Sequence, residues 1–235
     1  MVQWQLDEST IESWRTLPTL DCHKTALRLS IGCTLLLIAG TIWHQSLWPN
    51  YSPVSRTVSS LSALGVPHRQ SMTGLTILGG LLLVVISLLL DHCGKLGRIF
   101  LAVAGVSLIC VAVFPVPSVL ENSNAHTFFA AIFLIAMCLW PVAANFGHQA
   151  HLWAVPIRHS FTSSLTLALL GICFWVNWLV STSIMGLVER IFLTAQFLFL
   201  TFVIWSSRTG LKKRVCVQNC LAKSEVKVNR ELTLV

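Results

Sequence analysis

Charge is scarce in this sequence. Only 11% of its 235 residues are charged, whereas a soluble domain carries about 25% charged residues. Hydrophobic residues make up 54% of the chain, and its mean hydropathy is +0.73. This composition excludes a disordered chain, a soluble enzyme and a nucleic-acid-binding domain. The net charge of +7 is therefore better explained as a signal of membrane topology.

Several familiar catalytic motifs are also missing. The chain has no Gly-x-x-x-x-Gly-Lys-Ser/Thr phosphate loop, no Gly-x-Ser-x-Gly nucleophile elbow and no His-Glu-x-x-His zinc motif. No acidic residue lies near the middle of an apolar run, which argues against a simple proton-coupled pump. We therefore expect neither ATP-driven transport by this chain alone nor a cofactor.

What the chain does contain is six long apolar runs, none with a charge in its middle. Each is close to the 20 residues that a helix needs to cross a membrane. The runs cover residues 27–47, 71–90, 97–116, 125–146, 161–183 and 187–207. The alternative, a soluble helical bundle, would need polar faces at helical spacing, but residues 81–86 and 132–140 are apolar all round. The sequence predicts an all-α integral membrane protein, a bundle of six transmembrane helices.

Basic residues predict the orientation and divide the chain. Thirteen of the sixteen Lys and Arg residues lie on the side of the two termini, which we therefore place in the cytoplasm. No cysteine falls on the opposite side, so no disulfide framework is expected. This gives a cytoplasmic N-terminal segment (1–26), a six-helix membrane domain (27–207) and a basic cytoplasmic tail (208–235), which anionic lipid would attract.

The N-terminal segment shows no cleavable signal peptide, because it is polar and partly acidic. Ile11, Trp14 and Leu17 share one face at helical spacing. Two interpretations stay open here, a short helix on the inner membrane surface and a disordered tail.

The first outer loop, residues 48–70, is the exception among short connections. Ser52 suits an N-cap and Pro53 the first helical position, while Gly65 suits a left-handed C-terminal cap and Pro67 stops the helix. The loop therefore predicts a short interfacial helix of about three turns. It either anchors the first two spans or helps to form a site.

Polar residues of the outer loops form a candidate site at the mouth of the bundle. They are Arg56, Ser59, Ser60, Glu121, Asn122, Asn124, His126, Glu189 and Arg190. Arg190, with its planar fork, and Arg56 suit a phosphate or carboxylate, and we assign substrate binding to Arg56, Ser59 and Arg190.

Catalysis, if present, is assigned to His126 and Glu189. Glu189 fits a general base, or a structural ion pair with Arg56. His126 lies near a helix start, where the dipole favours the neutral ring. It fits a base, a metal ligand or a hydrogen-bonded core residue.

Three further arrangements of His or Cys suggest a metal or haem, but none of them is assigned to a site. His148 and His151 are three residues apart, but no acid or cysteine is adjacent. His44 and His126 both lie near the outer edge, yet the sequence does not show that they face each other. Cys216 and Cys220 would need more ligands to hold a metal.

The same loop carries a family resemblance. Tyr51-Ser52, Val58-Ser59, Leu61 and Gly65-Val66-Pro67, followed by Phe114-Pro115, His126 and the run 186–190, stand in the order and spacing of a known pattern. The chain thus resembles the bacterial six-span family catalogued as domain of unknown function 998, over residues 27–207. It departs from that pattern at Arg56, Ser60 and Ser62, where the family has an acid or amide, an acid and a glycine. Any chemistry of those carboxylates is therefore in doubt, and the family name itself implies no activity.

These observations lead to the expectation of a multi-pass protein of the bacterial inner membrane. Two function classes remain open. One is a protein that binds, and in one version modifies, an anionic lipid-linked substrate at the outer leaflet. The other is a non-enzymatic protein that stabilises an unidentified partner or senses the state of the envelope.

Overall fold

The computed structural model describes residues 8–91, 93–119, 121–146 and 155–232, and their side chains between residues 21 and 210. This part of the chain is entirely helical, without strands. Its elements are α1 (Glu8–Ser46), η1 (Ser59–Ser62), α2 (Arg69–Leu89), α3 (Lys95–Val113), α4 (Asn124–Ala143), α5 (Ile157–Val180) and α6 (Met185–Leu232).

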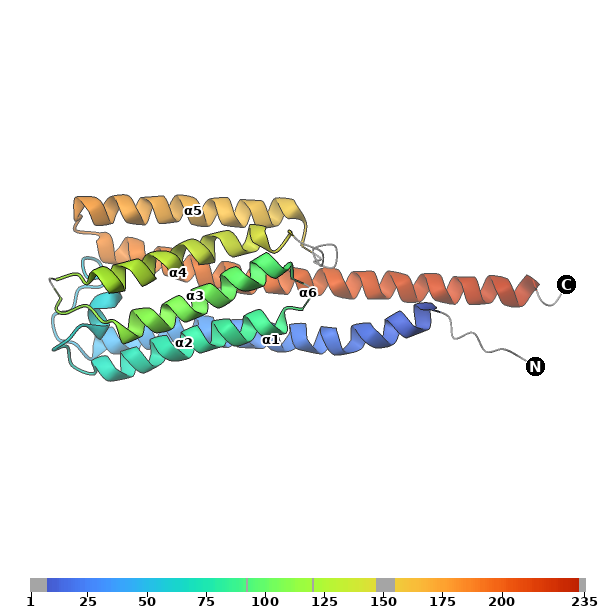
Figure 1. Cartoon of the computed structure of the whole chain (residues 1–235), viewed down its shortest axis with the longest axis horizontal. Helices are drawn as coiled ribbons and strands as arrows, with labels where there is room; N and C mark the ends of the chain where they lie inside the picture. The colour runs from blue at the N-terminus through green and yellow to red at the C-terminus, as the bar shows by residue number, and fades with distance from the viewer. Residues whose placement is uncertain (1–7, 92, 120, 147–154, 233–235) are drawn as a thin grey trace.

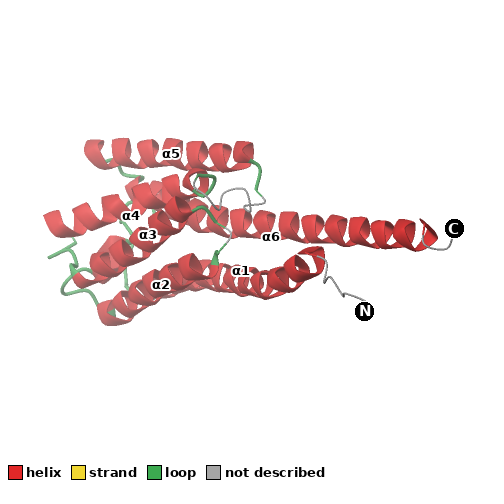
Figure 2. Cartoon of the chain, turned by 45° about the vertical axis from the view of Figure 1, so that its right-hand side comes forward, coloured by secondary structure: helices red, strands yellow, loops and turns green. Residues whose placement is uncertain are grey.

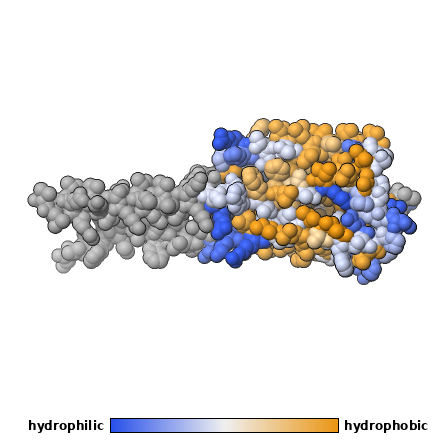
Figure 3. Space-filling view, turned by 180° about the vertical axis from the view of Figure 1, so that it is seen from behind, coloured by the Kyte–Doolittle hydropathy of each residue, from blue (hydrophilic) through white to orange (hydrophobic). Residues whose placement is uncertain are grey.

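All six α-helices are long and apolar enough to cross a membrane, which confirms the predicted fold class. The space-filling view shows why a bilayer suits them, because a hydrophobic band lies between more hydrophilic ends (Figure 3). Large apolar side chains such as Leu35, Trp43 and Leu179 are 62–72% exposed within that band. A lipid environment buries this surface, which water would leave unfavourably hydrated.

Two of the helices continue past the apolar band. The apolar part of α1 is Asp21–Ser46 and that of α6 is Met185–Gly210. Residues 8–20 thus extend α1, and neither a separate surface helix nor a disordered tail is seen there. The side chains of Ile11, Trp14 and Leu17 lie outside the described ones. The start of α1 and the end of α6 lie at the same end of the bundle (Figure 1).

The helices form a ring in chain order. Each one packs against the next, and α6 packs against α1 to close the ring. The two ribbon views show the helices running lengthwise along one common axis (Figures 1 and 2). Between α2 and α3 the backbones touch, since a Cβ on Gly80 would lie 2.6 Å from the Gly105 oxygen. Small residues at such crossings are what allow close packing inside a membrane.

The connection between α1 and α2, residues 47–68, is called loop 1 here, and its end of the bundle the loop-1 end. The predicted three-turn helix is wrong in length. The Ser52 hydroxyl does accept a hydrogen bond from the Ser55 N–H at 3.4 Å, and the Ser52 carbonyl oxygen accepts one from the Arg56 N–H at 2.9 Å. The helix does not continue after this single turn, and η1 adds only four residues. Gly65 has the predicted left-handed conformation, with φ of 85°.

Candidate functional site

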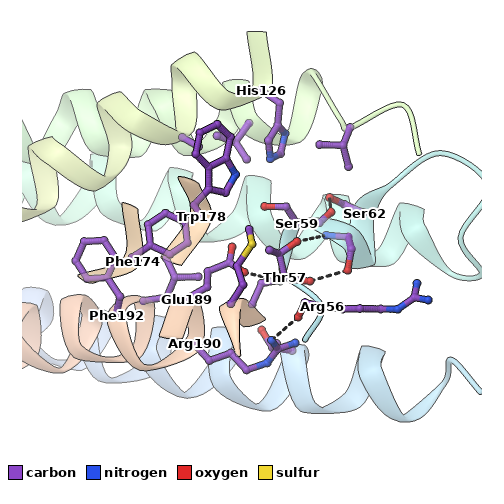
Figure 4. Close-up of a pocket in the computed structure, with 18 of the residues that line it drawn as sticks. Arg56, Thr57, Ser59, Ser62, His126, Phe174, Trp178, Glu189, Arg190 and Phe192 are labelled. Atoms are coloured by element: carbon purple, nitrogen blue, oxygen red, sulfur yellow. Dashed lines mark hydrogen bonds between the residues drawn. The ribbon is translucent and has the colours of Figure 1, made fainter. Parts of the chain in front are cut away.

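A cavity of about 870 Å³ lies inside the helix ring and reaches the loop-1 end (Figure 4). Its wall is apolar in the interior of the bundle, at Phe133, Leu134, Phe174, Phe192, Leu193 and Phe197. Toward loop 1 the wall becomes polar, at Thr57, Ser59, Ser60, Ser62, Glu121, Asn122, His126 and Glu189. All five residues assigned a site role from the sequence line this cavity: Arg56, Ser59, His126, Glu189 and Arg190.

Arg190 fastens loop 1 to the start of α6. Its Nη1 donates to the carbonyl oxygens of Pro53 at 2.9 Å and Arg56 at 2.8 Å, and to that of Gly186 at 2.9 Å. Its Nη2 donates to the Tyr51 hydroxyl. Charge-assisted bonds are among the stronger hydrogen bonds in proteins, so both Nη groups of the planar fork expected to bind an anion are already engaged by protein oxygens. The Nε is buried without a partner.

Glu189 holds the following part of the loop. Its Oε2 accepts from the Val58 N–H at 2.6 Å, and the residue is only 8% exposed. Among the described residues it makes no ion pair with Arg56. That guanidinium lies over the Trp48 ring, 5.0 Å from its centroid, and points away from Glu189 in the close-up (Figure 4). The predicted counter-ion pair is therefore not formed.

Gly186 permits this close docking. A Cβ at this position would lie 2.1 Å from the Arg56 carbonyl oxygen, so any larger residue would push the loop away. Beside it, the Leu187 N–H donates to the Val54 oxygen at 3.0 Å. This uses an amide that the first turn of a helix leaves without an internal partner.

Tyr51 completes the clamp from within loop 1. Its hydroxyl donates toward the carbonyls of Thr57 at 2.9 Å and Arg56 at 3.2 Å while it accepts from Arg190. Burial raises the pKa of this hydroxyl and outweighs the lowering effect of the nearby Arg190 charge. The sequence offered Tyr51 only as part of a family pattern, because nothing local shows that a tyrosine will meet an arginine 139 positions later.

His126 faces the cavity from the first turn of α4. Ser123 caps this helix by accepting from the His126 N–H at 3.5 Å. The ring Nδ1 lies 2.9 Å from the Phe114 oxygen. Because a carbonyl only accepts, Nδ1 must carry a proton, and in the neutral ring Nε2 keeps its lone pair. That Nε2 is buried without a partner, in a residue only 4% exposed.

The remaining candidates separate from this cluster. Asn124 does not line the cavity. His44 uses both ring nitrogens, toward the Gly40 oxygen and the Ser71 hydroxyl, each at 2.7 Å, so the haem pairing with His126 is not formed. Within the described residues no three His, Cys, Asp or Glu side chains are grouped to hold a metal. His148 and His151, and the side chains of Cys216 and Cys220, lie outside the described part.

Comparison with known proteins places the chain in a family. No curated protein and no solved structure matches it. Residues 31–206 match the family described as protein of unknown function (DUF998), which covers nearly all of the six spans. The resemblance carried by loop 1, His126 and the start of α6 is thereby confirmed, and the chain belongs to the DUF998 family of proteins.

Proposed function

We propose that this protein binds an amphipathic, membrane-derived molecule in the ring cavity, with its polar part at the loop-1 end. The observation that carries the proposal is the division of one cavity into an apolar interior and a polar rim, inside a bundle that lipid surrounds. A volume of about 870 Å³ lies within the range of small-molecule sites, roughly 300–1,000 Å³. Such a space accommodates a headgroup and part of an acyl or prenyl chain.

The geometry supports different roles for the predicted site residues. Ser59, His126 and Glu189 are proposed as ligand contacts, because they line the polar end. Arg190 is proposed as a positioning residue, since loop 1 engages its guanidinium. Arg56 contributes its carbonyl to the clamp and directs its guanidinium toward Trp48. An anionic ligand held by the two arginines is therefore less well supported than a ligand held by His126 and Glu189.

A second candidate function is chemistry on the bound molecule. The lone pair of His126 Nε2 faces the cavity without a protein partner, as a general base requires. Glu189 would then orient the ligand or serve as the second acid–base group. This version predicts a chemically altered lipid as product, whereas binding alone leaves the lipid unchanged.

We further propose that the loop-1 end faces away from the cytoplasm. The support is the distribution of Lys and Arg, which gathers at the end where α1 begins and α6 ends. Segments 1–26 and 208–235 would then be cytoplasmic, and in a bacterial cell the cavity would open to the outer leaflet of the inner membrane.

The test is to identify what the purified protein retains. The wild-type chain is extracted into detergent, washed and examined by native mass spectrometry, with lipids identified after denaturation. In Ala130→Phe a ring enters the cavity, whereas Ala131→Phe changes the next residue, which does not line it. We expect lipid on the wild type and Ala131→Phe but not on Ala130→Phe. Equal retention by all three, or none by the wild type, would contradict the proposal and favour the partner-stabilising function.

A further inference from the structure

We infer that the polar part of the ligand is a hydrogen-bond donor, either a protonated amine or a group of hydroxyls, and not a bare anionic group. This inference rests on the proposed function, because it names the class of headgroup that the same cavity takes. It follows from which polar atoms at the loop-1 end remain available once the internal bonds of the protein are counted.

The cationic side chains that line the cavity are engaged within the protein. Among the described residues, two basic side chains line the cavity, Arg56 and Arg190. Arg190 gives its two Nη groups to oxygens of loop 1, Tyr51 and its own helix, and Arg56 lies over Trp48. The Nε of Arg190 is buried without a partner, but it is a single donor and not a fork. A phosphate entering this end would have to break the loop-1 clamp to gain an arginine fork.

Four hydroxyl groups of the cavity wall donate their protons to backbone carbonyls. Ser60 donates its proton to the Thr57 oxygen at 2.6 Å, and Ser62 donates to the Ser59 oxygen at 3.0 Å. Farther along the wall, Thr41 and Thr76 donate to the carbonyls four residues earlier, at 2.7 and 2.9 Å. A hydroxyl whose proton is committed in this way can only accept a further hydrogen bond. These four groups therefore present lone pairs to the cavity.

Two titratable residues at the polar end of the cavity, His126 and Glu189, add further hydrogen-bond acceptors. His126 presents the lone pair of Nε2 without a protein donor. Glu189 presents its carboxyl oxygens, which accept hydrogen bonds from Val58 and Ser59 and have further lone pairs. A buried acceptor without a donor costs free energy. A headgroup that brings N–H or O–H donors removes that cost, whereas an anionic headgroup would place further lone pairs against it.

Two headgroup sources share this chemistry, and the experiment separates them. The wild-type protein is placed in phosphatidylcholine nanodiscs that contain, in separate samples, phosphatidylethanolamine, a galactosyl diacylglycerol or phosphatidic acid. The ethanolamine headgroup differs from choline by N–H donors, galactose supplies hydroxyls, and phosphatidic acid supplies an anion. Native mass spectrometry after detergent exchange measures how far each lipid is enriched on the protein over the bulk bilayer.

We expect about tenfold enrichment of a donor lipid over phosphatidylcholine, the factor that one charge-assisted hydrogen bond supplies, and none of phosphatidic acid. The amine source predicts that Glu189→Gln abolishes the preference, and the hydroxyl source predicts that it survives. His126→Asn keeps a donor for the Phe114 carbonyl but removes Nε2, and should reduce either preference several-fold. The matched control is His44→Asn, which is outside the cavity and should change nothing.

Enrichment of phosphatidic acid, or an unchanged preference in His126→Asn, would overturn the inference while leaving a lipid-binding cavity in place. If no lipid is retained above the level of Ala130→Phe, the proposed function itself fails. The two failures are therefore distinguishable in one set of measurements.

Discussion

Arg190 and Arg56, both expected to hold an anion, are instead bonded to each other through the main chain, with Arg190 Nη1 donating to the Arg56 carbonyl over 2.8 Å. The neighbouring Glu189 accepts from the Val58 N–H, so two adjacent residues of α6 hold loop 1 on either side of Thr57. These bonds fix the polar rim of the cavity. The pair is therefore a structural clamp whose position also determines what the cavity presents to a ligand.

The clamp predicts unequal effects for the two arginines. Arg190→Ala removes bonds to three loop-1 groups and should lower the free energy of unfolding by about 2–4 kcal/mol. Arg56→Ala removes one partly exposed cation–π contact and should cost about 0.5–1 kcal/mol. Denaturant titration of both variants in the same detergent measures the difference. Equal losses would show that Arg190 does not fasten the loop as described.

Gly186 offers a test of the close docking. Gly186→Ala places a methyl group 2.1 Å from the Arg56 oxygen, so loop 1 must move, and the protein should lose about 1–3 kcal/mol. Gly74→Ala is the matched control, because a Cβ there meets nothing within 4 Å and alanine favours a helix by about 1 kcal/mol. Thermal unfolding should move down for the first variant and not for the second. A neutral Gly186→Ala would mean that the loop is not seated on α6.

The tyrosine predicts a dependence on alkaline pH. The pKa of Tyr51 is raised above its ordinary value of 10 by burial. The unfolded chain would ionise this residue at lower pH than the folded one, so its contribution to stability is complete below pH 10 and decreases as the pH rises above it. Tyr51 is the single tyrosine of the chain, so the ultraviolet absorbance of tyrosinate reports the ionisation of this residue alone. A normal titration midpoint in the folded protein would contradict its burial in the clamp.

Orientation has its own test. Leu64 lies in loop 1 and is 46% exposed, so Leu64→Cys, in a chain with the native cysteines replaced, should react with a membrane-impermeant maleimide in intact cells. A chain that keeps only Cys93 is the control. Burial raises the pKa of this thiol to about 12, so at neutral pH it is protonated and should react slowly even after lysis. Labelling of Leu64→Cys only after lysis would reverse the proposed topology.

The spans could be predicted from the sequence because hydropathy is a local property. The six apolar runs differ from the observed helices mainly at their ends, where capping and loop contacts decide the boundary. Gly65 was also predictable, since its left-handed conformation is a local requirement of the backbone.

The loop-1 helix was not predictable in its true length. Ser52 and Pro53 favour a helix start, and one turn does form. The next turns are replaced because Arg190, Glu189 and Leu187, more than 130 residues away, bond the main chain of loop 1. Tertiary bonds of this kind leave no local pattern. The sequence did indicate Arg56 as a possible ion-pair partner of Glu189, but not that the actual partner would be the backbone of loop 1.

The proposal that an amphipathic molecule occupies the ring cavity is tested most directly by an experimental structure of the wild-type protein in a native-lipid nanodisc. We expect elongated density that begins beside His126 and Glu189 and continues between Phe174 and Phe197. A cavity that contains only water, or that side chains have closed, would contradict it.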